Sequence, residues 1–160
     1  MEIRLVLFLP RDAASVPVSR QVLDGCLETL GVTVDTRTDI ALALSEACAN
    51  VIQHAGPGDE YEVLASARRG RCVIEVVNTG SGGAATPGAR PGGGTPFAVP
   101  ADPVPPTAEH GRGLRIIDAV ADNVRLTGGD GQGTTVHFEK ALDWVPGAAG
   151  QHLFSADTAG

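Results

Sequence analysis

The stretch SEACANVIQHAG, residues 45–56, carries Glu46, Asn50 and His54 at four-residue intervals within an alanine-rich, apolar run. In a helix these three side chains would lie one turn apart along one line. An apolar stripe runs beside that line and is formed by Ile40, Leu44, Ala47 and Val51. A polar line that borders a buried face can form the wall of a pocket. The same spacing also occurs on the solvated edge of ordinary helices, and a His near a helix C-terminus is typical of a capping cation.

The two polar residues at the centre of this helix suit phosphoryl chemistry. A glutamate such as Glu46 can act as a base, and the side-chain oxygen of Asn50 is a hard ligand of the kind that Mg²⁺ accepts. Since one turn separates them, one could hold a metal ion while the other aligns a nucleophile.

Hydrophobic patterning predicts the elements on both sides of this helix. The predicted order is strand, helix, helix, strand, strand, loop, helix, strand, strand. We expect the first strand at 2–9, helices at 16–30 and 35–54, and two strands within 61–80 that are joined at Arg69-Gly70. A helix at 111–123 and a closing hairpin at 123–128 and 133–142 follow. This order predicts an α+β, two-layer sandwich in which helices cover one face of a mixed, mostly antiparallel sheet. We expect one domain over residues 1–142 and a flexible C-terminal tail over 143–160.

Residues 79–109 differ from the rest in composition. They are so rich in Gly and Pro that neither a helix nor a strand is expected to persist there. Such a long loop is typical of an active-site lid or of a tolerated insertion.

Composition narrows the classes of partner. The 160 residues carry a net charge of −7, and the twelve Lys and Arg residues form no cluster, which argues against direct nucleic-acid binding. The three cysteines form no CxxC pair, so neither a disulfide framework nor a zinc site is expected. The opening segment IRLVLFLP, residues 3–10, is too short to span a membrane and lacks the features of a signal peptide. These features predict a cytoplasmic protein without membrane association.

Two glycine motifs follow the polar helix along the chain. VVNTGSGG, residues 76–83, ends an apolar strand, and HGRGL, residues 110–114, begins a helix. Glycines allow close approach to a backbone, and free N–H groups at a helix N-terminus attract phosphate. A single Gly-rich turn is weak evidence, so the order and spacing of all three segments matter more.

This combination resembles the Bergerat-fold ATPases, the superfamily of gyrase, the heat-shock chaperone, sensor histidine kinases and the mismatch-repair ATPase. Their N box, E-x-x-x-N, matches Glu46 and Asn50. Their first glycine box, D-x-G-x-G, is matched except at its first position, by Asn78, Gly80 and Gly82. The second box, G-x-G-L, and a closing G-T pair are matched by Gly111, Gly113, Leu114, Gly133 and Thr134.

Within the superfamily, ALALSEACANVIQHA (residues 41–55) and GRGLRIIDAVADNVRL (residues 111–126) look most like the anti-sigma factor serine-protein kinases. The resemblance covers roughly residues 2–140 and implies the histidine kinase-like ATPase fold. It also implies a protein serine/threonine kinase that uses ATP and Mg²⁺.

The resemblance implies a role for each matched residue. Asn50 would hold Mg²⁺ against the triphosphate, and Glu46 would be the general base toward a serine hydroxyl of a partner protein. The amides around Gly111 and Gly113 would cradle phosphates, under an ATP lid formed by residues 83–109.

The remaining matches concern the nucleotide pocket. Gly80 and Gly82 would shape the adenine site, with Thr134 nearby, and Leu114 completes the second glycine box. Arg112 would reach a phosphate, although an exposed structural arginine would fit the sequence equally well.

Asn78 stands where the family has the Asp that accepts the hydrogen bond of the adenine amino group. An amide oxygen can still accept, but it is neutral, and its NH₂ group needs an acceptor of its own. Charge-assisted bonds are about twice as strong as neutral ones, so the substitution is expected to cost about 1–2 kcal/mol of binding.

The resemblance implies an anti-sigma factor that sequesters a sigma factor and phosphorylates a small anti-anti-sigma (STAS-type) antagonist on serine. Dimerisation is common in this family, so a homodimer is among the expected assemblies. A first alternative is a partner-binding module on the same fold, with nucleotide absent or only structural. A second, the catalytic domain of a histidine kinase, fits less well because only a strand and one helix precede the N box.

Overall fold

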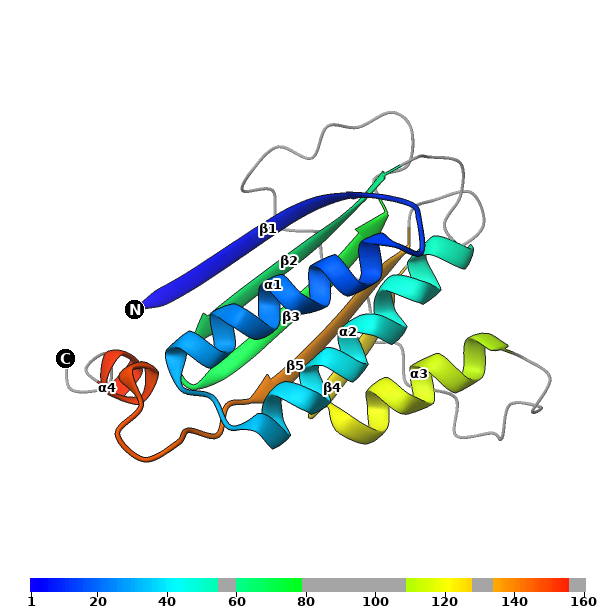
Figure 1. The fold of residues 1–160 in the computed structure, drawn as a ribbon. Helices are drawn as coiled ribbons and strands as arrows, with labels where there is room; N and C mark the ends of the chain where they lie inside the picture. The colour runs from blue at the N-terminus through cyan, green and yellow to red at the C-terminus, as the bar shows by residue number, and fades with distance from the viewer. Residues whose placement is uncertain (55–59, 79–108, 128–133, 156–160) are drawn as a thin grey trace.

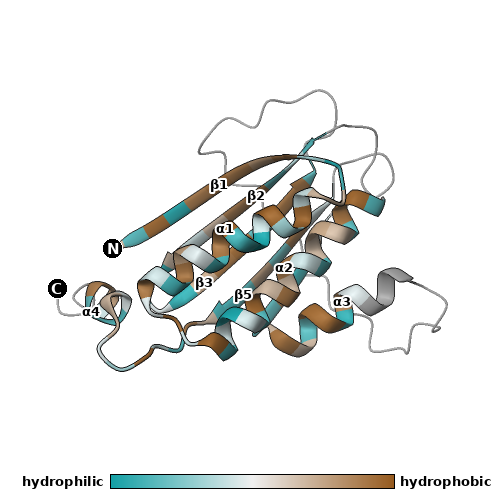
Figure 2. Cartoon of the chain, in the orientation of Figure 1, coloured by the Kyte–Doolittle hydropathy of each residue, from teal (hydrophilic) through white to brown (hydrophobic). Residues whose placement is uncertain are grey.

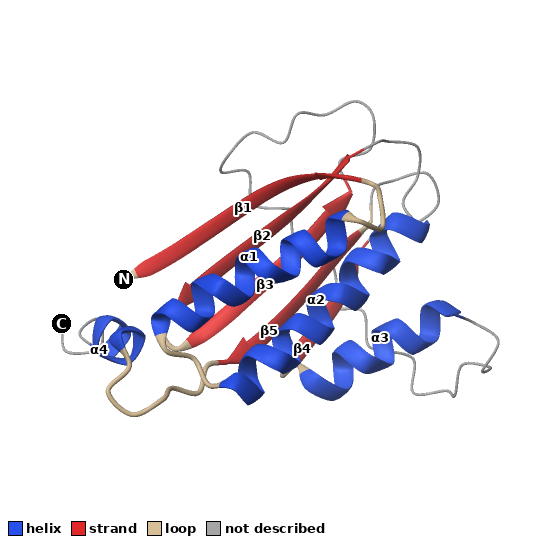
Figure 3. Cartoon of the chain, viewed as in Figure 1, coloured by secondary structure: helices blue, strands red, loops and turns tan. Residues whose placement is uncertain are grey.

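The computed structural model describes residues 1–54, 60–78, 109–127 and 134–155. Its elements (Figures 1 and 3) are β1 (Glu2–Pro10), α1 (Ser15–Leu30), α2 (Val34–His54), β2 (Glu60–Arg68), β3 (Arg71–Asn78), α3 (Glu109–Val120), β4 (Asn123–Thr127), β5 (Thr135–Ala141) and α4 (Ala149–Ser155). From β1 to β5 they follow the order predicted from the sequence, whereas α4 was not predicted. None of these helices is both long enough and apolar enough to cross a bilayer.

The strands form one sheet in the order β1-β2-β3-β5-β4. All four pairings between described strands are antiparallel, so the parallel component of the expected mixed sheet is not found among them. β5 inserts between β3 and β4, although β4 precedes it in the sequence. This order brings the end of β3 next to the start of β5, where the backbone N–H of Asn78 donates to the carbonyl of Thr134 at 2.9 Å.

The helices α1, α2 and α3 cover one face of the sheet, as predicted (Figure 1). Alternate residues of β3 point toward this helical layer and are buried, namely Cys72, Ile74, Val76 and Asn78. The residues between them are only half-buried or exposed, because no described element covers the other face. The residues of β1 also alternate between more exposed and more buried positions, although Figure 2 shows that most of this strand is hydrophobic.

The apolar stripe of α2 is buried as expected. Its residues Ile40, Leu44, Ala47 and Val51 are at most 1% exposed. Glu46 and Asn50 lie along the flank of that stripe and are half-buried. The side chain of His54 lies outside the described part of the structure.

Tight turns set the register of the first hairpin and the end of α1. Arg69 and Gly70 both have positive φ angles, 49° and 73°, as a two-residue type I′ turn requires. The turn pairs Arg68 with Arg71 and, at the far end of the hairpin, Tyr61 with Asn78. Gly31 ends α1 in the left-handed conformation, directly after the end predicted for a helix at 16–30.

The C-terminal segment forms ordered structure where a flexible tail was expected. Residues Val32 and Trp144 form an isolated antiparallel bridge, and α4 follows it. Phe154 of α4 is 4% exposed and stacks on Trp144, with ring centroids 5.7 Å apart. The segment is small and polar in sequence, but its two aromatic rings and Gly150 pack together at the end of α1. Residues 156–160 are outside the described part of the chain.

Candidate active site

Glu46 and Gly113, which belong to two different motifs, are in contact in the structure. A Cβ atom built on Gly113 would lie 3.1 Å from Oε2 of Glu46 and 4.0 Å from its Cβ. The contact arises where α3 packs beside α2, and it places the carboxylate against the first turns of α3. No described cation forms an ion pair with Glu46, so its carboxylate is available as a base.

Asn50 lies one turn further along α2, on the same flank. Its side chain is half-buried and makes no hydrogen bond to another described residue. An amide oxygen in this state fits the single protein ligand that a nucleotide-bound Mg²⁺ commonly takes.

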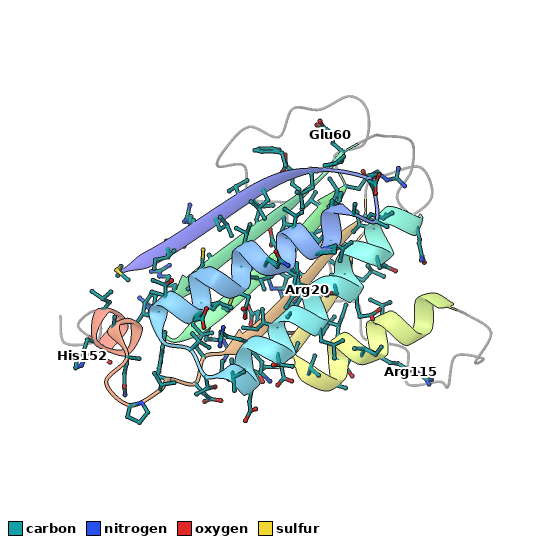
Figure 4. The ribbon with its side chains drawn as sticks, in the orientation of Figure 1. Arg20, Glu60, Arg115 and His152 are labelled. Carbon is teal, nitrogen blue, oxygen red and sulfur yellow. The ribbon has the colours of Figure 1, made fainter. Side chains whose placement is uncertain are left out.

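The N-terminus of α3 presents backbone donors beside this flank. By the geometry of an α-helix, the first four N–H groups, those of residues 109–112, have no acceptor within the helix. Gly111 therefore contributes a free amide, whereas the amide of Gly113 is the first that α3 itself can bond. Arg115 projects from α3 into solvent, away from α2 (Figure 4).

Asn78 and Thr134, which were both predicted for the nucleotide pocket, meet at the adjoining ends of β3 and β5. Asn78 is 4% exposed, and neither Oδ1 nor Nδ2 has a hydrogen-bond partner. Its cross-strand neighbour Tyr61 is fully buried, and the Tyr61 hydroxyl lies 2.6 Å from Oγ of Ser15. Burial raises the pKa of Tyr61 to about 12, so this hydroxyl stays protonated.

The other predicted residues divide into two groups. Leu114 is half-buried and packs against the hydrophobic core, which is a structural role. Gly80, Gly82, Gly133 and most of the expected lid, residues 83–108, lie outside the described residues, as does the side chain of Arg112.

Sequence reasoning missed one residue beside the site. Tyr61 could have been found by counting back from the Arg69-Gly70 turn, because an antiparallel register places it opposite Asn78. Arg20 lies outside the site, between α1 and α2 (Figure 4), where its Nη1 is 3.5 Å from Oγ of Ser45, whereas Glu46 contacts α3 on the other flank of α2. No sequence signal points to Arg20, since its position depends on how α1 packs on α2.

The strands that carry Asn78 and Thr134 are joined by a charged pair on the uncovered face of the sheet. Nδ1 of His137 on β5 lies 3.0 Å from Oε1 of Glu75 on β3. The hydrogen bond to Glu75 raises the pKa of His137 against the opposing effect of burial, and the same bond lowers the pKa of Glu75. Nε2 of His137 is 3.4 Å from Glu139 but poorly aligned for a hydrogen bond, so that contact is mainly electrostatic.

The candidate site thus consists of a glutamate beside a glycine-rich helix start and a buried amide at the end of a central strand. A family model described as the histidine kinase-like ATPase domain matches residues 9–140. The chain belongs to this family.

Two proteins similar to this chain are named serine-protein kinases. The chain is 29% identical over 137 residues to the serine-protein kinase RsbW of Bacillus velezensis, covering 84% of this chain and 83% of that protein. It is 28% identical over 131 residues to the serine-protein kinase RsbW of Bacillus mycoides, covering 80% and 79%.

A solved structure of the RsbU and RsbW domains of a Mycobacterium tuberculosis protein matches with a TM-score of 0.61 and 21% identity. The match covers 88% of this chain and 32% of the solved chain, and it supports the fold alone.

Proposed function

We propose that the chain is an ATP-dependent serine-protein kinase that acts as an anti-sigma factor. It binds a sigma factor, and it phosphorylates a STAS-type anti-anti-sigma protein on serine. The observation that carries the proposal is the contact between Glu46 and Gly113, because it joins a base to the helix start that would hold the phosphates. The named serine-protein kinases among its relatives support the same reaction class.

In this proposal Glu46 accepts the proton of the partner's serine hydroxyl. The hydroxyl oxygen forms a bond to the γ-phosphorus of ATP, and the bond to the β,γ-bridging oxygen breaks to release ADP. Asn50 would hold Mg²⁺, and the bound ion would neutralise charge on the triphosphate. The free amides of residues 109–112 bind phosphate oxygens and orient the transferred group.

Glu46→Gln tests the base. The substitution keeps the size and polarity of the side chain but cannot accept the proton, so we expect phosphotransfer to fall by about 10²- to 10⁴-fold. Binding of Mg·ATP, measured by calorimetry, should change less than about threefold, since Glu46 does not hold the nucleotide. Transfer is measured from γ-labelled ATP to a STAS-type protein of the same organism.

Glu60→Gln is the matched control, because Glu60 is exposed at the start of β2 (Figure 4). It should leave both phosphotransfer and binding unchanged. Full phosphotransfer by Glu46→Gln would overturn the assignment of the base.

Asn50→Ala tests the metal ligand. We expect it to weaken Mg·ATP binding strongly and to leave Mg²⁺-free nucleotide binding almost unchanged. Equal binding of Mg·ATP by both proteins would exclude Asn50 as the ligand.

The second candidate function is partner binding without catalysis, and Asn78 in place of the family's Asp favours it. In that case the complex with the sigma factor would form equally well with and without ATP. Asn50→Ala would then leave complex formation unchanged, whereas the kinase proposal predicts that nucleotide alters it.

A further inference from the structure

The side chain of Asn78 is the least satisfied polar group in the described part of the chain. Four described residues have a buried side-chain atom without a hydrogen-bond partner, and only Asn78 has none at either of its polar atoms. Buried amides are normally hydrogen-bonded, and each unsatisfied group is costly. The Asn78 side chain is 96% buried and lacks hydrogen bonds at both polar atoms, which indicates that a bound ligand supplies them.

The surroundings hold the Asn78 backbone and leave its amide free. The backbone N–H donates to Thr134, which fixes the end of β3 against β5. The hydroxyl of its cross-strand neighbour Tyr61 is engaged with Ser15. The strand neighbours Val76 and Val136 are apolar and fully buried. Since the terminal torsion of Asn is broad and roughly two-fold, the amide can present either end to a ligand.

Because the amide can take either orientation, Asn78 can hydrogen-bond to different substituents at the purine 6-position. A carboxylate only accepts hydrogen bonds, so it favours the 6-amino group of adenine and repels a 6-oxo group. An amide both donates and accepts. Its oxygen can accept from the 6-amino group while its NH₂ bonds to the ring nitrogen of adenine. In the flipped orientation its NH₂ donates to a 6-oxo group while its oxygen accepts from N1–H.

We propose that Asn78 makes the nucleotide site tolerant of the purine 6-substituent, so that 6-oxopurine triphosphates bind and donate phosphoryl groups as ATP does. The proposal rests on the proposed nucleotide site but concerns its specificity. It follows from an unpartnered, buried amide at the position that the first glycine box of the resembled superfamily, D-x-G-x-G, gives to Asp. A neutral residue there also avoids burying a charge in apolar surroundings.

Calorimetric titration with Mg·ATP and Mg·ITP tests the proposal, because inosine differs from adenosine only at the 6-position and the adjoining N1. We expect the wild-type protein to bind the two within about threefold of each other. Asn78→Asp should restore discrimination and raise the ratio of ATP to ITP affinity by about tenfold or more, since O6 then faces a carboxylate. Asn78→Leu, which has similar volume, should weaken both nucleotides equally.

Each outcome has a separate meaning. A wild-type preference for ATP of more than tenfold would overturn the tolerance and leave the nucleotide site intact. Binding of neither triphosphate would overturn the proposed function itself, and this inference with it. The wild-type ratio needs no variant, so the test holds even if Asn78→Asp does not fold.

Discussion

A single missing side chain at Gly113 allows the proposed base to lie against α3. A Cβ at this position would approach Oε2 of Glu46 to 3.1 Å, which is tighter than an ordinary contact. The atom that must move is the end of a flexible side chain, so the steric cost is small, but the carboxylate is displaced. Of the two glycines in this motif, Gly113 thus positions the proposed base, and Gly111 offers a free amide.

Gly113→Ala separates these effects. We expect phosphotransfer to fall by at least tenfold, while the free energy of unfolding stays constant or rises by up to about 1 kcal/mol, because Ala has the higher helix propensity. Urea unfolding followed by circular dichroism gives the second quantity. Loss of both stability and activity would show that the glycine serves folding rather than placement of Glu46.

At the scale of elements, much of the structure was predictable because its signals are local. Gly31 ends α1 and the Arg69-Gly70 pair fixes the first hairpin, and both are visible in the sequence. The insertion of β5 between β3 and β4 was not predictable, since nothing local distinguishes it from a simple hairpin at the edge. The contact of Glu46 with Gly113 depends in turn on how α3 packs against α2.

α4 escaped prediction for a related reason. Its sequence is small and polar, and it gains stability only from contacts with Trp144 and the end of α1. Because a short isolated helix is marginal in water, the aromatic stack decides whether it forms.

Phe154→Ala tests the contribution of α4 to stability. We expect a loss of about 3 kcal/mol in the free energy of unfolding, because a buried aromatic ring is removed. Leu153→Ala is the neighbouring control, since Leu153 is 46% exposed, and its effect should stay within about 0.5 kcal/mol. Equal effects of the two substitutions in urea unfolding would contradict the packing of α4.

The pair of His137 and Glu75 makes the β3–β5 contact dependent on pH. The raised pKa of His137 gives stability that is complete below its ordinary value of 6.5 and is lost as pH rises through the folded value. The lowered pKa of Glu75 gives stability that is complete above its ordinary value of 4.5 and is lost as pH falls. Both contributions are therefore fully present between about pH 4.5 and 6.5.

His137→Gln should remove this dependence. We expect the variant to be less stable than the wild type by about 1 kcal/mol near pH 6, and the difference to shrink as pH rises toward 9. Urea unfolding at a series of pH values gives the comparison. A difference that does not vary with pH would show that the ring contributes by packing and not by charge.

At the scale of the whole molecule, the sheet has one buried and one uncovered face. The layers are visible in Figure 1, and β1 shows the consequence most clearly, because adjacent residues point to opposite faces. Phe8 is 69% exposed on the uncovered face, whereas Leu9 is 8% exposed beneath the helices.

Because one face of the sheet is buried and the other is exposed, substitutions at two adjacent residues should differ in their cost to stability. Leu9→Ala should cost about 2–3 kcal/mol of unfolding free energy, and Phe8→Ala should cost no more than about 0.5 kcal/mol. Both values come from urea unfolding. A large loss with Phe8→Ala would mean that the uncovered face is buried in solution, as it would be in a homodimer.

The tryptophan and the tyrosine of this chain are spectroscopic probes of different ends of the sheet. Its only tryptophan, Trp144, lies beside α4, and its only tyrosine, Tyr61, lies next to Asn78 at the opposite end of the sheet (Figure 1). Emission from the indole therefore reports undocking of α4, and absorbance of the phenol reports changes around Asn78. Without any label, spectroscopy can therefore follow the two ends of the sheet separately.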